Sequence, residues 1–326
     1  MNIIKPYYEI IGNVNEVDTL TKLEKIIRVC YKSEDKITDT SKYDFLAKIV
    51  ERKHHAMLEH SNFTFSINDN IYYNYLIHSD LVKWMKTSTE IKLINNESIH
   101  GVVTLSARSI LDLIASEDCY LQQIGLNIVN VSSISLKDKC ILFGVTDAQL
   151  MDVNKHLDIF EITDEIKNKF ISKIEYLKHS FMSIKFVCDR GVSHELVRHR
   201  CSFAQESTRY CNYSKDKFGK EITVIKPIFY EEGTELYDNW YSSCESDEST
   251  YFWLLENGST PQEARANLPN SLKTEIVVTM ALINWNHFFH MRVPKTAHPQ
   301  MRELTIPLYK ELTTDINNLF DEIDID

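Results

Sequence analysis

Glycine, proline and cysteine are all scarce in this chain, with 8, 7 and 7 residues among 326. So few glycines and prolines argue against low-complexity linkers, collagen-like repeats and long disordered tails. The cysteines are thinly spread and include no Cys-x-x-Cys pair. A disulfide framework and a zinc ribbon are therefore disfavoured, and a reducing compartment is expected.

Long apolar runs are also missing. No window approaches the roughly 20 apolar residues that a membrane span needs. The opening residues 1–6 lack a basic region followed by an apolar stretch, so no signal peptide is indicated. We expect a cytoplasmic protein without a membrane partner.

Positive charge is outnumbered, because 36 Lys and Arg residues stand against 47 Asp and Glu residues, a formal net charge of −11. A general nucleic-acid binder would carry a basic surface, so no nucleic-acid partner is expected. A local basic pocket remains compatible with this balance. The 43% of hydrophobic residues supplies ample apolar surface for a core.

Helical and strand-like patterns interleave without a strict βαβ alternation, which predicts the α+β class, with a mixed sheet flanked by helices. Helices are predicted at 20–31, 43–52, 107–115 and 284–291, and strands at 62–67 (half-buried), 101–105, 183–188 and 275–280. Residues 127–152 are poorly patterned. Residues 189–191 are interpreted as a turn, with Ser193 as the N-cap of a short helix through Arg200.

The last third carries clearer helix signals. Thr260-Pro-Gln-Glu263 combines a capping Thr, a Pro at the first helical position and a Glu at the third, and Pro269 ends that helix. Pro299 begins the final helix, which Pro307 is expected to kink. Its apolar positions are Met301, Leu304, Leu308, Leu312, Ile316, Leu319 and Ile323.

His194 and His199 invite a zinc-protease interpretation that their spacing contradicts. The zinc motif places two histidines four residues apart on one helical face. A separation of five residues turns them about 140° apart on a helix, so one ion could not be chelated. His54, His55 and His60 are also clustered, but they lack a fourth ligand; helix-end packing or surface exposure is the plain alternative. No metal site is predicted.

A basic cluster stands out in this acidic chain. Arg198-His-Arg200 is followed by Ser207-Thr-Arg209-Tyr210. Arginine binds phosphate through two parallel hydrogen bonds, and hydroxyl groups can add further ones. The alternative is that Glu195 and Glu206 pair with these arginines in a solvated network.

These residues resemble the signature of the flavin-dependent thymidylate synthases. Residues 55–65 are similar to that family's Glu-His-x-x-Phe-Thr-Phe segment. Ala264-Arg265 with Leu268-Pro269 resembles its Ala-Arg-x-x-Leu-Pro segment. Residues 287–292, 297–300 and 302–303 resemble its last conserved region. The resemblance implies a single domain over 1–326, like thymidylate synthase-complementing protein, with a family-atypical insertion at about 68–180.

The chain departs from the family pattern at three places. Six residues separate Arg200 from Ser207, where the family usually has seven. Ala56 stands where the family has a hydroxyl near the flavin. Ala281 and Ile283 replace an Asn and an Arg at the flavin-binding join of strand and helix. Flavin contacts must therefore differ in part.

The resemblance implies FAD-dependent methylation of dUMP to dTMP, with methylenetetrahydrofolate as carbon donor and NADPH as reductant. It also implies a homotetramer with shared active sites. Arg292 is the catalytic candidate; the alternative is a helix-end arginine that complements the helix dipole. Substrate binding is expected of Glu195, Arg198, Gln205, Glu206, Ser207, Arg209, Arg265 and Arg292. Cofactor binding is expected of Arg198, His199, Arg200, Gln205, His287 and His298.

Two alternatives remain open. The short loop favours a second hypothesis, a catalytically impaired nucleotide- or flavin-binding homologue with a regulatory role. Cys201 lies beside Arg198 and Arg200, whose charges could depress its pKa, but an inert buried thiol is the other interpretation. No covalent enzyme nucleophile is required, because the hydride and carbon transfers are cofactor chemistry.

Overall fold

A computed structural model describes residues 1–11, 18–82, 84–153, 157–315 and 320–325. Its strands are β1 (Asn2–Ile4), β2 (Tyr7–Ile10), β3 (Asn62–Ile67), β4 (Lys86–Lys92), β5 (Ser98–Ser106), β6 (Ile159–Glu161), β7 (Phe181–Asp189), β8 (Ser202–Gln205), β9 (Thr223–Ile225) and β10 (Lys273–Ala281). Its helices are α1 (Thr19–Val29), α2 (Ser41–Glu51), α3 (Asn70–Ile77), α4 (Ala107–Ile114), α5 (Cys119–Val131), α6 (Leu136–Phe143), α7 (Asp147–Met151), α8 (Asp164–Lys167), α9 (Lys173–His179), α10 (Arg190–Leu196), α11 (Glu235–Glu256), α12 (Pro261–Ala264), α13 (Leu282–Arg292) and α14 (Pro299–Asp315).

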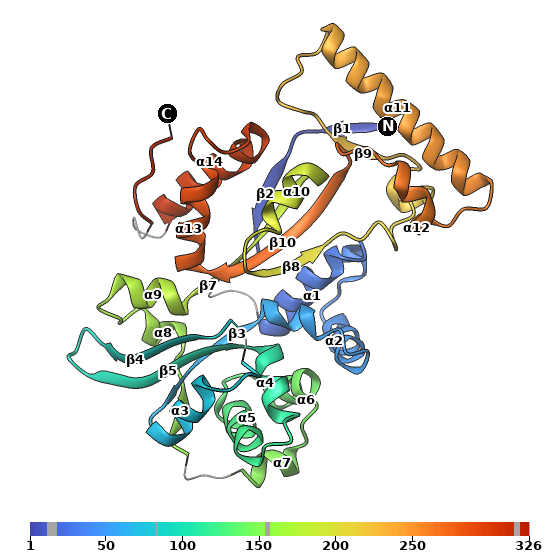
Figure 1. Cartoon of the computed structure of the whole chain (residues 1–326). Helices are drawn as coiled ribbons and strands as arrows, with labels where there is room; N and C mark the ends of the chain where they lie inside the picture. The colour runs from blue at the N-terminus through green and yellow to red at the C-terminus, as the bar shows by residue number, and fades with distance from the viewer. Residues whose placement is uncertain (12–17, 83, 154–156, 316–319, 326) are drawn as a thin grey trace.

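The α+β class is confirmed. Parallel and antiparallel strand pairs both occur in the described residues, but in different sheets. Two four-stranded sheets, β2-β7-β10-β8 and β4-β5-β3-β6, are antiparallel throughout. Parallel pairing occurs between β1 and β9, which form a separate two-stranded sheet. The two larger sheets lie one above the other in Figure 1, each with helices packed against it.

The upper sheet is built around β10, which pairs with β7 from Lys273↔Asp189 to Ala281↔Phe181. Along its other edge, β10 pairs with the short strand β8. One face of this sheet packs against α13 and α14, where Phe186, Trp285 and Phe288 are almost completely buried. Helix α10 follows β7 and helix α13 follows β10, so the pairing of these two strands fixes where both helices begin.

Helix α1 joins the two halves of the molecule. Asp18 caps it, because its side chain accepts a hydrogen bond from the Thr21 backbone N–H. Ile26 and Val29 pack against Ala204 and Val277 of the upper sheet. The opposite side of α1, with Leu20, Leu23 and Ile27, belongs to the core beneath. The end of α1 is thereby fixed beside β8.

We call residues 68–180 the middle segment. Strands β4 to β6 and helices α3 to α7 make up most of it, and β3, which precedes it, completes the lower sheet (Figure 1). The poorly patterned residues 127–152 contain the end of α5 and all of α6 and α7, which the sequence analysis did not predict. Successive residues of α5 are buried from Ile124 to Val129, so no single apolar face marks the helix. Helix α7 has only five residues and begins with a capping box of Thr146 and Gln149.

Strand β3 is buried on both faces, so its predicted half-exposure is wrong. Phe63 and Phe65 lie in the lower core. On the opposite face the Thr64 hydroxyl lies 2.9 Å from that of Thr104, and Ser66 donates to the His100 carbonyl at 2.7 Å. The polar residues of the alternating pattern are thus buried with hydrogen-bond partners.

The predicted turn at 189–191 is also wrong. Strand β7 passes directly into α10, because the Asp189 side chain accepts a hydrogen bond from the Val192 backbone N–H at 2.9 Å and caps the helix. Ser193 lies inside the helix, where its hydroxyl donates to the Arg190 carbonyl at 2.9 Å. The helix ends at Leu196, so residues 198–200 follow it rather than belong to it.

The C-terminal elements largely follow the sequence. The capping box of Thr260 and Glu263 is present. In α14 the buried apolar positions are Met301, Leu304, Leu308 and Leu312. Ile316 and Leu319 lie outside the described residues, and Ile323 lies in an irregular segment rather than in the helix. Pro307 lies inside α14, and the kink stays a prediction.

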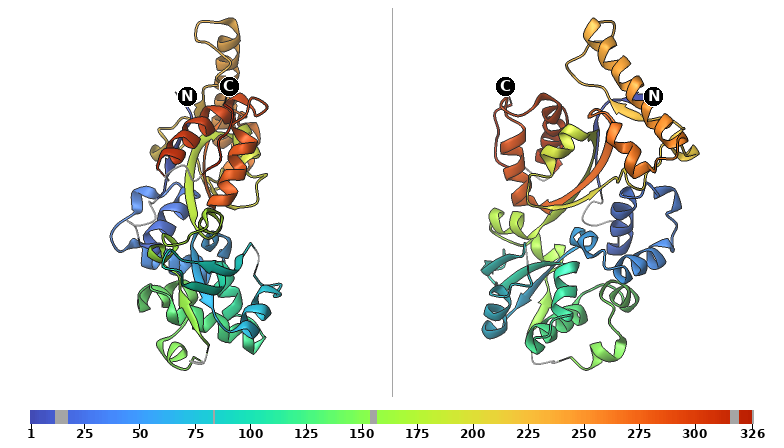
Figure 2. Two further views of the ribbon diagram at one scale, coloured as in Figure 1. Left: turned by 90° about the vertical axis from the view of Figure 1, so that its left-hand side faces the viewer. Right: turned by 45° about the vertical axis from the view of Figure 1, so that its right-hand side comes forward.

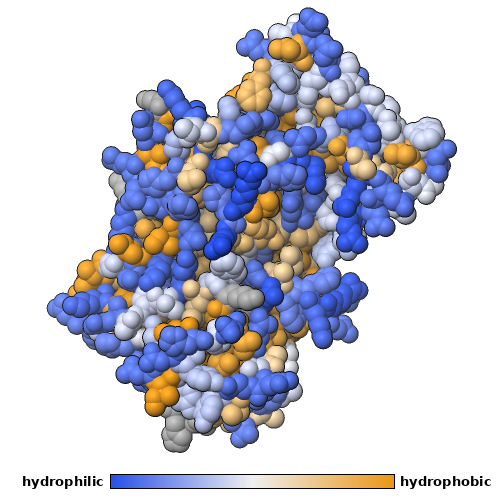
Figure 3. Space-filling view, in the orientation of Figure 1, coloured by the Kyte–Doolittle hydropathy of each residue, from blue (hydrophilic) through white to orange (hydrophobic). Residues whose placement is uncertain are grey.

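The surface is uneven in character. Helix α11 projects from the upper half of the molecule in all views of Figures 1 and 2. In Figure 3 less polar residues gather where the upper and lower halves meet, on an otherwise mainly hydrophilic face. Among the described helices, none is both long enough and apolar enough to cross a membrane.

Candidate active site

The segment from Val197 to Tyr210 carries most of the predicted site residues and runs along the seam between the two halves. It leaves α10, forms β8 at the edge of the upper sheet, and passes the end of α1, where the Ser207 N–H donates to the Cys30 carbonyl at 3.2 Å. Its side chains face three cavities, two of which share Arg108 and Asp112 in their walls, and one hydrogen-bonded cluster. Within one chain the predicted residues do not share a single cavity.

Glu195, His199 and Arg292 form the hydrogen-bonded cluster. The Arg292 guanidinium donates from Nη1 to Glu195 Oε2 at 2.8 Å, from Nη2 to the Glu195 carbonyl at 3.0 Å, and from Nε to His199 Nε2 at 2.9 Å. These bonds use three of the five N–H donors of the guanidinium. The group is therefore held in one orientation at the end of α13.

His199 is held in its neutral form. Burial and the positive charge of Arg292 lower the pKa of His199 to about 4, with a smaller contribution from His287. Because Nε2 accepts the bond from Arg292, the ring proton lies on Nδ1. The ring also packs edge-on against Phe288, with centroids 4.9 Å apart. His199 thus orients Arg292 without adding a second positive charge at neutral pH.

Arg265 lies in a cavity of about 460 Å³ together with Arg190 and Thr208. Its Nη1 lies 3.5 Å from the Thr208 hydroxyl. Among the described residues, neither arginine has a recorded ion pair with a carboxylate. Two guanidinium groups and a hydroxyl in one cavity suit the oxygens of a phosphate.

Arg190 was missed by the sequence analysis, because residues 189–191 were interpreted as a turn. The first turn of α10 is an unfavourable place for a cation with respect to the helix dipole, and no sequence motif assigned Arg190 to a site.

Gln205 and Ser207 line a second cavity of about 590 Å³, between the end of α1 and residues 53–57. The Gln205 amide donates to the Ser193 hydroxyl at 3.1 Å and to the Thr274 hydroxyl at 3.2 Å. Tyr31 and Tyr210 also line this cavity, with ring centroids 5.8 Å apart. Ala56 lies here too and contributes no hydroxyl to this wall.

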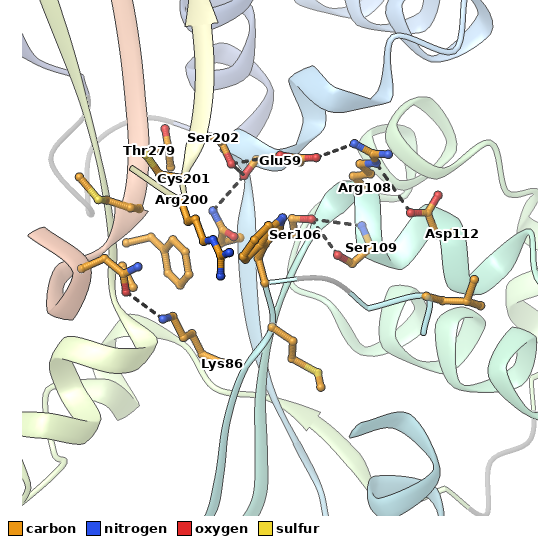
Figure 4. Close-up of a pocket in the computed structure, with 18 of the residues that line it drawn as sticks. Glu59, Lys86, Ser106, Arg108, Ser109, Asp112, Arg200, Cys201, Ser202 and Thr279 are labelled. Atoms are coloured by element: carbon orange, nitrogen blue, oxygen red, sulfur yellow. Dashed lines mark hydrogen bonds and ion pairs between the residues drawn. The ribbon is translucent and has the colours of Figure 1, made fainter. Parts of the chain in front are cut away.

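Arg200 lines the third cavity, of about 610 Å³, which Figure 4 draws in close-up. Cys201 and Ser202 lie beside it. Burial raises the pKa of the Cys201 thiol to about 12, which favours the inert thiol over an activated one. Ala281 lines the same cavity and contributes no polar side chain to it.

Glu206 lies outside these cavities. Its side chain is 1% exposed, and Oε2 lies 2.9 Å from Lys273 Nζ. The Tyr213 hydroxyl donates to Oε1 at 3.3 Å. Both acids of the proposed solvated network are therefore paired, but Glu195 pairs with Arg292 and Glu206 with a lysine. No ion pair is recorded between either acid and Arg198, Arg200 or Arg209 in the described part of the chain.

Four further predicted residues lie on the exposed surface of the chain: Arg198, Arg209, His287 and His298. The Arg209 guanidinium lies 5.7 Å from the Tyr210 ring centroid, and the ring of His298 meets Phe229 edge-on at 5.6 Å. None of these four side chains lines the three cavities described above.

Among the described residues, the histidines outside this set form no metal site. His60 is fully buried, its Nδ1 lies 2.6 Å from the Thr279 hydroxyl, and burial lowers its pKa to about 3. His194 is exposed. Within the described ranges, no group of three His, Cys, Asp or Glu side chains is arranged to hold a metal ion.

One protein family matches this chain. The sequence profile described as thymidylate synthase complementing protein matches residues 14–89 and 159–315, more than half of the chain, and leaves 90–158 between the matched parts.

Curated proteins called flavin-dependent thymidylate synthase are similar in sequence. The protein of Pyrococcus furiosus is 33% identical over 126 residues, 38% of this chain and 51% of that protein. The protein of Sulfolobus acidocaldarius is 35% identical over 153 residues, 46% and 55% of the two chains. The protein of Geobacter sulfurreducens is 29% identical over 163 residues, 45% and 68%. The chain spans about half the length of the first of these relatives.

Proposed function

Because this chain belongs to the thymidylate synthase complementing protein family, we propose that it is a flavin-dependent thymidylate synthase. It would convert dUMP to dTMP, with methylenetetrahydrofolate as carbon donor, NADPH as reductant and FAD as bound cofactor. The observation that carries this proposal is the triply hydrogen-bonded Arg292 guanidinium.

Methylation requires carbon 5 of the uracil ring to become a nucleophile. Negative charge then develops on the ring carbonyls and N3. A guanidinium that is already oriented stabilises this charge without reorganising during the reaction. Glu195 and His199 provide that orientation for Arg292, and its remaining N–H donors are the groups we assign to the uracil edge.

The alternative role for Arg292 is to complement the C-terminal dipole of α13. That interaction needs only proximity to the last turn. It does not require hydrogen bonds from the guanidinium to a carboxylate and an imidazole that lie nearly a hundred positions away in the sequence. Glu195 and His199 accept such bonds from Arg292. We therefore favour the substrate role.

We assign the dUMP phosphate to Arg265, Thr208 and the newly identified Arg190. Their cavity combines a hydroxyl with two guanidinium groups for which no ion pair is recorded in the described part of the chain. Ser207 and Arg209 come from the adjoining loop. Gln205, fixed by Ser193 and Thr274, is assigned to the base or ribose. The buried Glu206 would support the loop rather than touch the substrate directly.

The residues around Arg200 fit a flavin dinucleotide. A dinucleotide needs aromatic or apolar surface for its rings and cations for its pyrophosphate, and the Arg200 cavity has Trp84, Met85 and Met280 beside Arg200 and Lys86. When bound, FAD supplies the redox chemistry that links NADPH oxidation to methyl formation. Arg200 would hold the pyrophosphate, and the walls of the cavity would exclude water.

We also propose a homotetramer, in which neighbouring copies join the separate cavities of one chain into complete sites. The exposure of Arg198, Arg209, His287 and His298 supports this, because four polar side chains of the proposed site face outward. The middle segment at about 68–180 is proposed as an insertion into a single domain.

The test is an assay of the purified full chain. We expect a yellow protein with a flavin spectrum, NADPH oxidation that dUMP stimulates, and dTMP as the product on chromatography. Deoxyuridine is the matched control, because it lacks the phosphate and should not stimulate oxidation. A protein that binds FAD and dUMP but forms no dTMP would favour the regulatory homologue, which the short loop between Arg200 and Ser207 also suggests.

A further inference from the structure

The Arg200 cavity lies at the seam between the two sheets, and its two walls come from different parts of the chain. One wall is formed by residues 200–202 and the end of β10. The other is formed by Trp84–Lys86 and by residues 106–112 of the middle segment. Of its lining residues, Arg200 alone belongs to the predicted site set. The middle segment therefore contributes a wall that the motif analysis did not assign.

Trp84 presents an aromatic ring to this cavity. It is 64% exposed, an unusual state for so large an apolar side chain. The Arg200 guanidinium lies over the indole, 5.6 Å from the ring centroid. Trp84 also has a φ of +63°, which is strained for a bulky residue. An exposed ring beside a guanidinium provides a stacking surface next to a positive charge.

Lys86 adds a second cation. Its Nζ donates to Asn284 Oδ1 at 2.8 Å, across the seam (Figure 4). Among the described residues, no ion pair with a carboxylate is recorded for Lys86 or Arg200. Arg108 differs, because Glu59 lies 2.6 Å and Asp112 3.8 Å from its guanidinium. Two of the three cations in the cavity are thus available to an anion.

Asp80 lines the same cavity, and no ion pair is recorded for it within the described ranges. A carboxylate accepts hydrogen bonds from ribose hydroxyls, whereas it repels a phosphate on the ribose. The cavity therefore combines an aromatic ring with two cations and one acid that have no recorded ion pair among the described residues. Its other two acids, Glu59 and Asp112, pair with Arg108. This chemistry suits an unphosphorylated adenosine joined to a pyrophosphate, and it favours FAD over NADPH.

We propose that Trp84 and Lys86, together with Arg200, bind the adenosine diphosphate half of FAD. The indole stacks on the adenine, and the two cations bind pyrophosphate oxygens. Ala281, the last residue of β10, also lines this cavity and offers no polar side chain to the pyrophosphate. The identity of the dinucleotide rests on the proposed function; the binding chemistry does not.

The test measures binding rather than turnover. Flavin-free full-length protein is titrated with FAD, and flavin fluorescence reports the Kd. Base stacking on an aromatic side chain predicts that Trp84→Ala weakens FAD binding roughly 5- to 150-fold. Trp84→Phe should recover most of it. Lys86→Met should weaken binding about tenfold or more, through a lost charge-assisted bond. The controls are Trp253→Ala, an exposed tryptophan on α11, and Lys92→Met, an exposed lysine on the same strand as Lys86.

Two further ligands, ADP and FMN, test which half of FAD the cavity binds. ADP alone, measured by calorimetry, should lose affinity in parallel with FAD, whereas FMN, which lacks the adenosine, should bind Trp84→Ala as it binds the parent. Circular dichroism verifies that the variants are folded. Unchanged FAD and ADP affinities in folded Trp84→Ala would overturn the proposal, as would a loss confined to NADPH. If all variants behave as expected but no dTMP forms, the proposed function fails and this inference stands.

Discussion

The Lys273→Met substitution tests how the loop before Ser207 is held in place. Lys273 Nζ lies 2.9 Å from Glu206 Oε2 and 2.8 Å from Glu275 Oε1. Glu275 keeps Lys32 at 2.7 Å, whereas Glu206 has no second ion pair recorded among the described residues and interacts with Lys32 only at longer range. Because the Glu206 side chain is 1% exposed, removing the ammonium leaves a buried carboxylate without a direct cationic partner. Such a loss costs about 3–5 kcal/mol of unfolding free energy.

Thermal and urea unfolding measure this cost. A loss of about 3–5 kcal/mol corresponds to roughly 4–7 °C in Tm, because a chain of 326 residues unfolds with an entropy of about 2.1 cal/mol/K per residue. Lys169→Met is the control, because its ion pair with Glu165 is exposed and should contribute less than about 1 kcal/mol. Adding Glu206→Gln to Lys273→Met removes the stranded charge and should recover much of the loss, as a double-mutant cycle would report. A Lys273→Met protein as stable as the control variant, or a double variant with no recovery, would refute the reasoning.

Three other predictions concern the site and its electrostatics. Arg292→Ala should abolish dTMP formation while FAD remains bound, as product assay and absorption spectrum would show; near-parental turnover would exclude Arg292 as the activating group. Arg209→Lys should raise the Kd for dUMP, because a lysine cannot make two parallel bonds to phosphate, and unchanged affinity in calorimetry would remove Arg209 from the site. Burial opposes the charge of Glu275, but Lys273 and Lys32 outweigh it and lower its pKa to about 2. Glu275 therefore stabilises the fold above pH 4.5, and this contribution is lost as the pH falls from 4.5 to about 2. Unfolding curves of Glu275→Gln and the parent should converge over that range, and a constant difference would contradict the assignment.

Local sequence signals predicted much of the fold. The capping box at Thr260, the apolar spacing of α1 and the β-rich run of β10 each depend on neighbouring residues, and each element formed where it was expected. In the middle segment α4 formed where it was expected, but α5 was missed because burial on all sides from Ile124 to Val129 removes the periodicity that marks a helix. Helix α7, with five residues, is too short to show a period. Asp189 and Ser193 are both suitable N-cap residues and lie four positions apart. Their spacing in the sequence does not show which of them begins α10, and the structure has Asp189 as the cap.

The motifs identified candidate residues but not their partners. Glu206 meets Lys273 because β8 pairs with β10, and a register between strands 67 residues apart cannot be read from spacing. Trp84 faces Arg200 for the same reason, since the lower sheet brings the middle segment to the seam. The cluster of Glu195, His199 and Arg292 likewise depends on how α10 and α13 pack against one sheet.

Transfer of a labelled carbon tests the central claim most directly. Purified protein is incubated with FAD, NADPH, dUMP and methylenetetrahydrofolate that carries carbon-13 in its methylene group, and the nucleotide product is analysed by mass spectrometry. We predict dTMP whose methyl carbon is labelled, in an amount that depends on NADPH. A flavin-loaded protein that returns only unchanged dUMP would contradict the account.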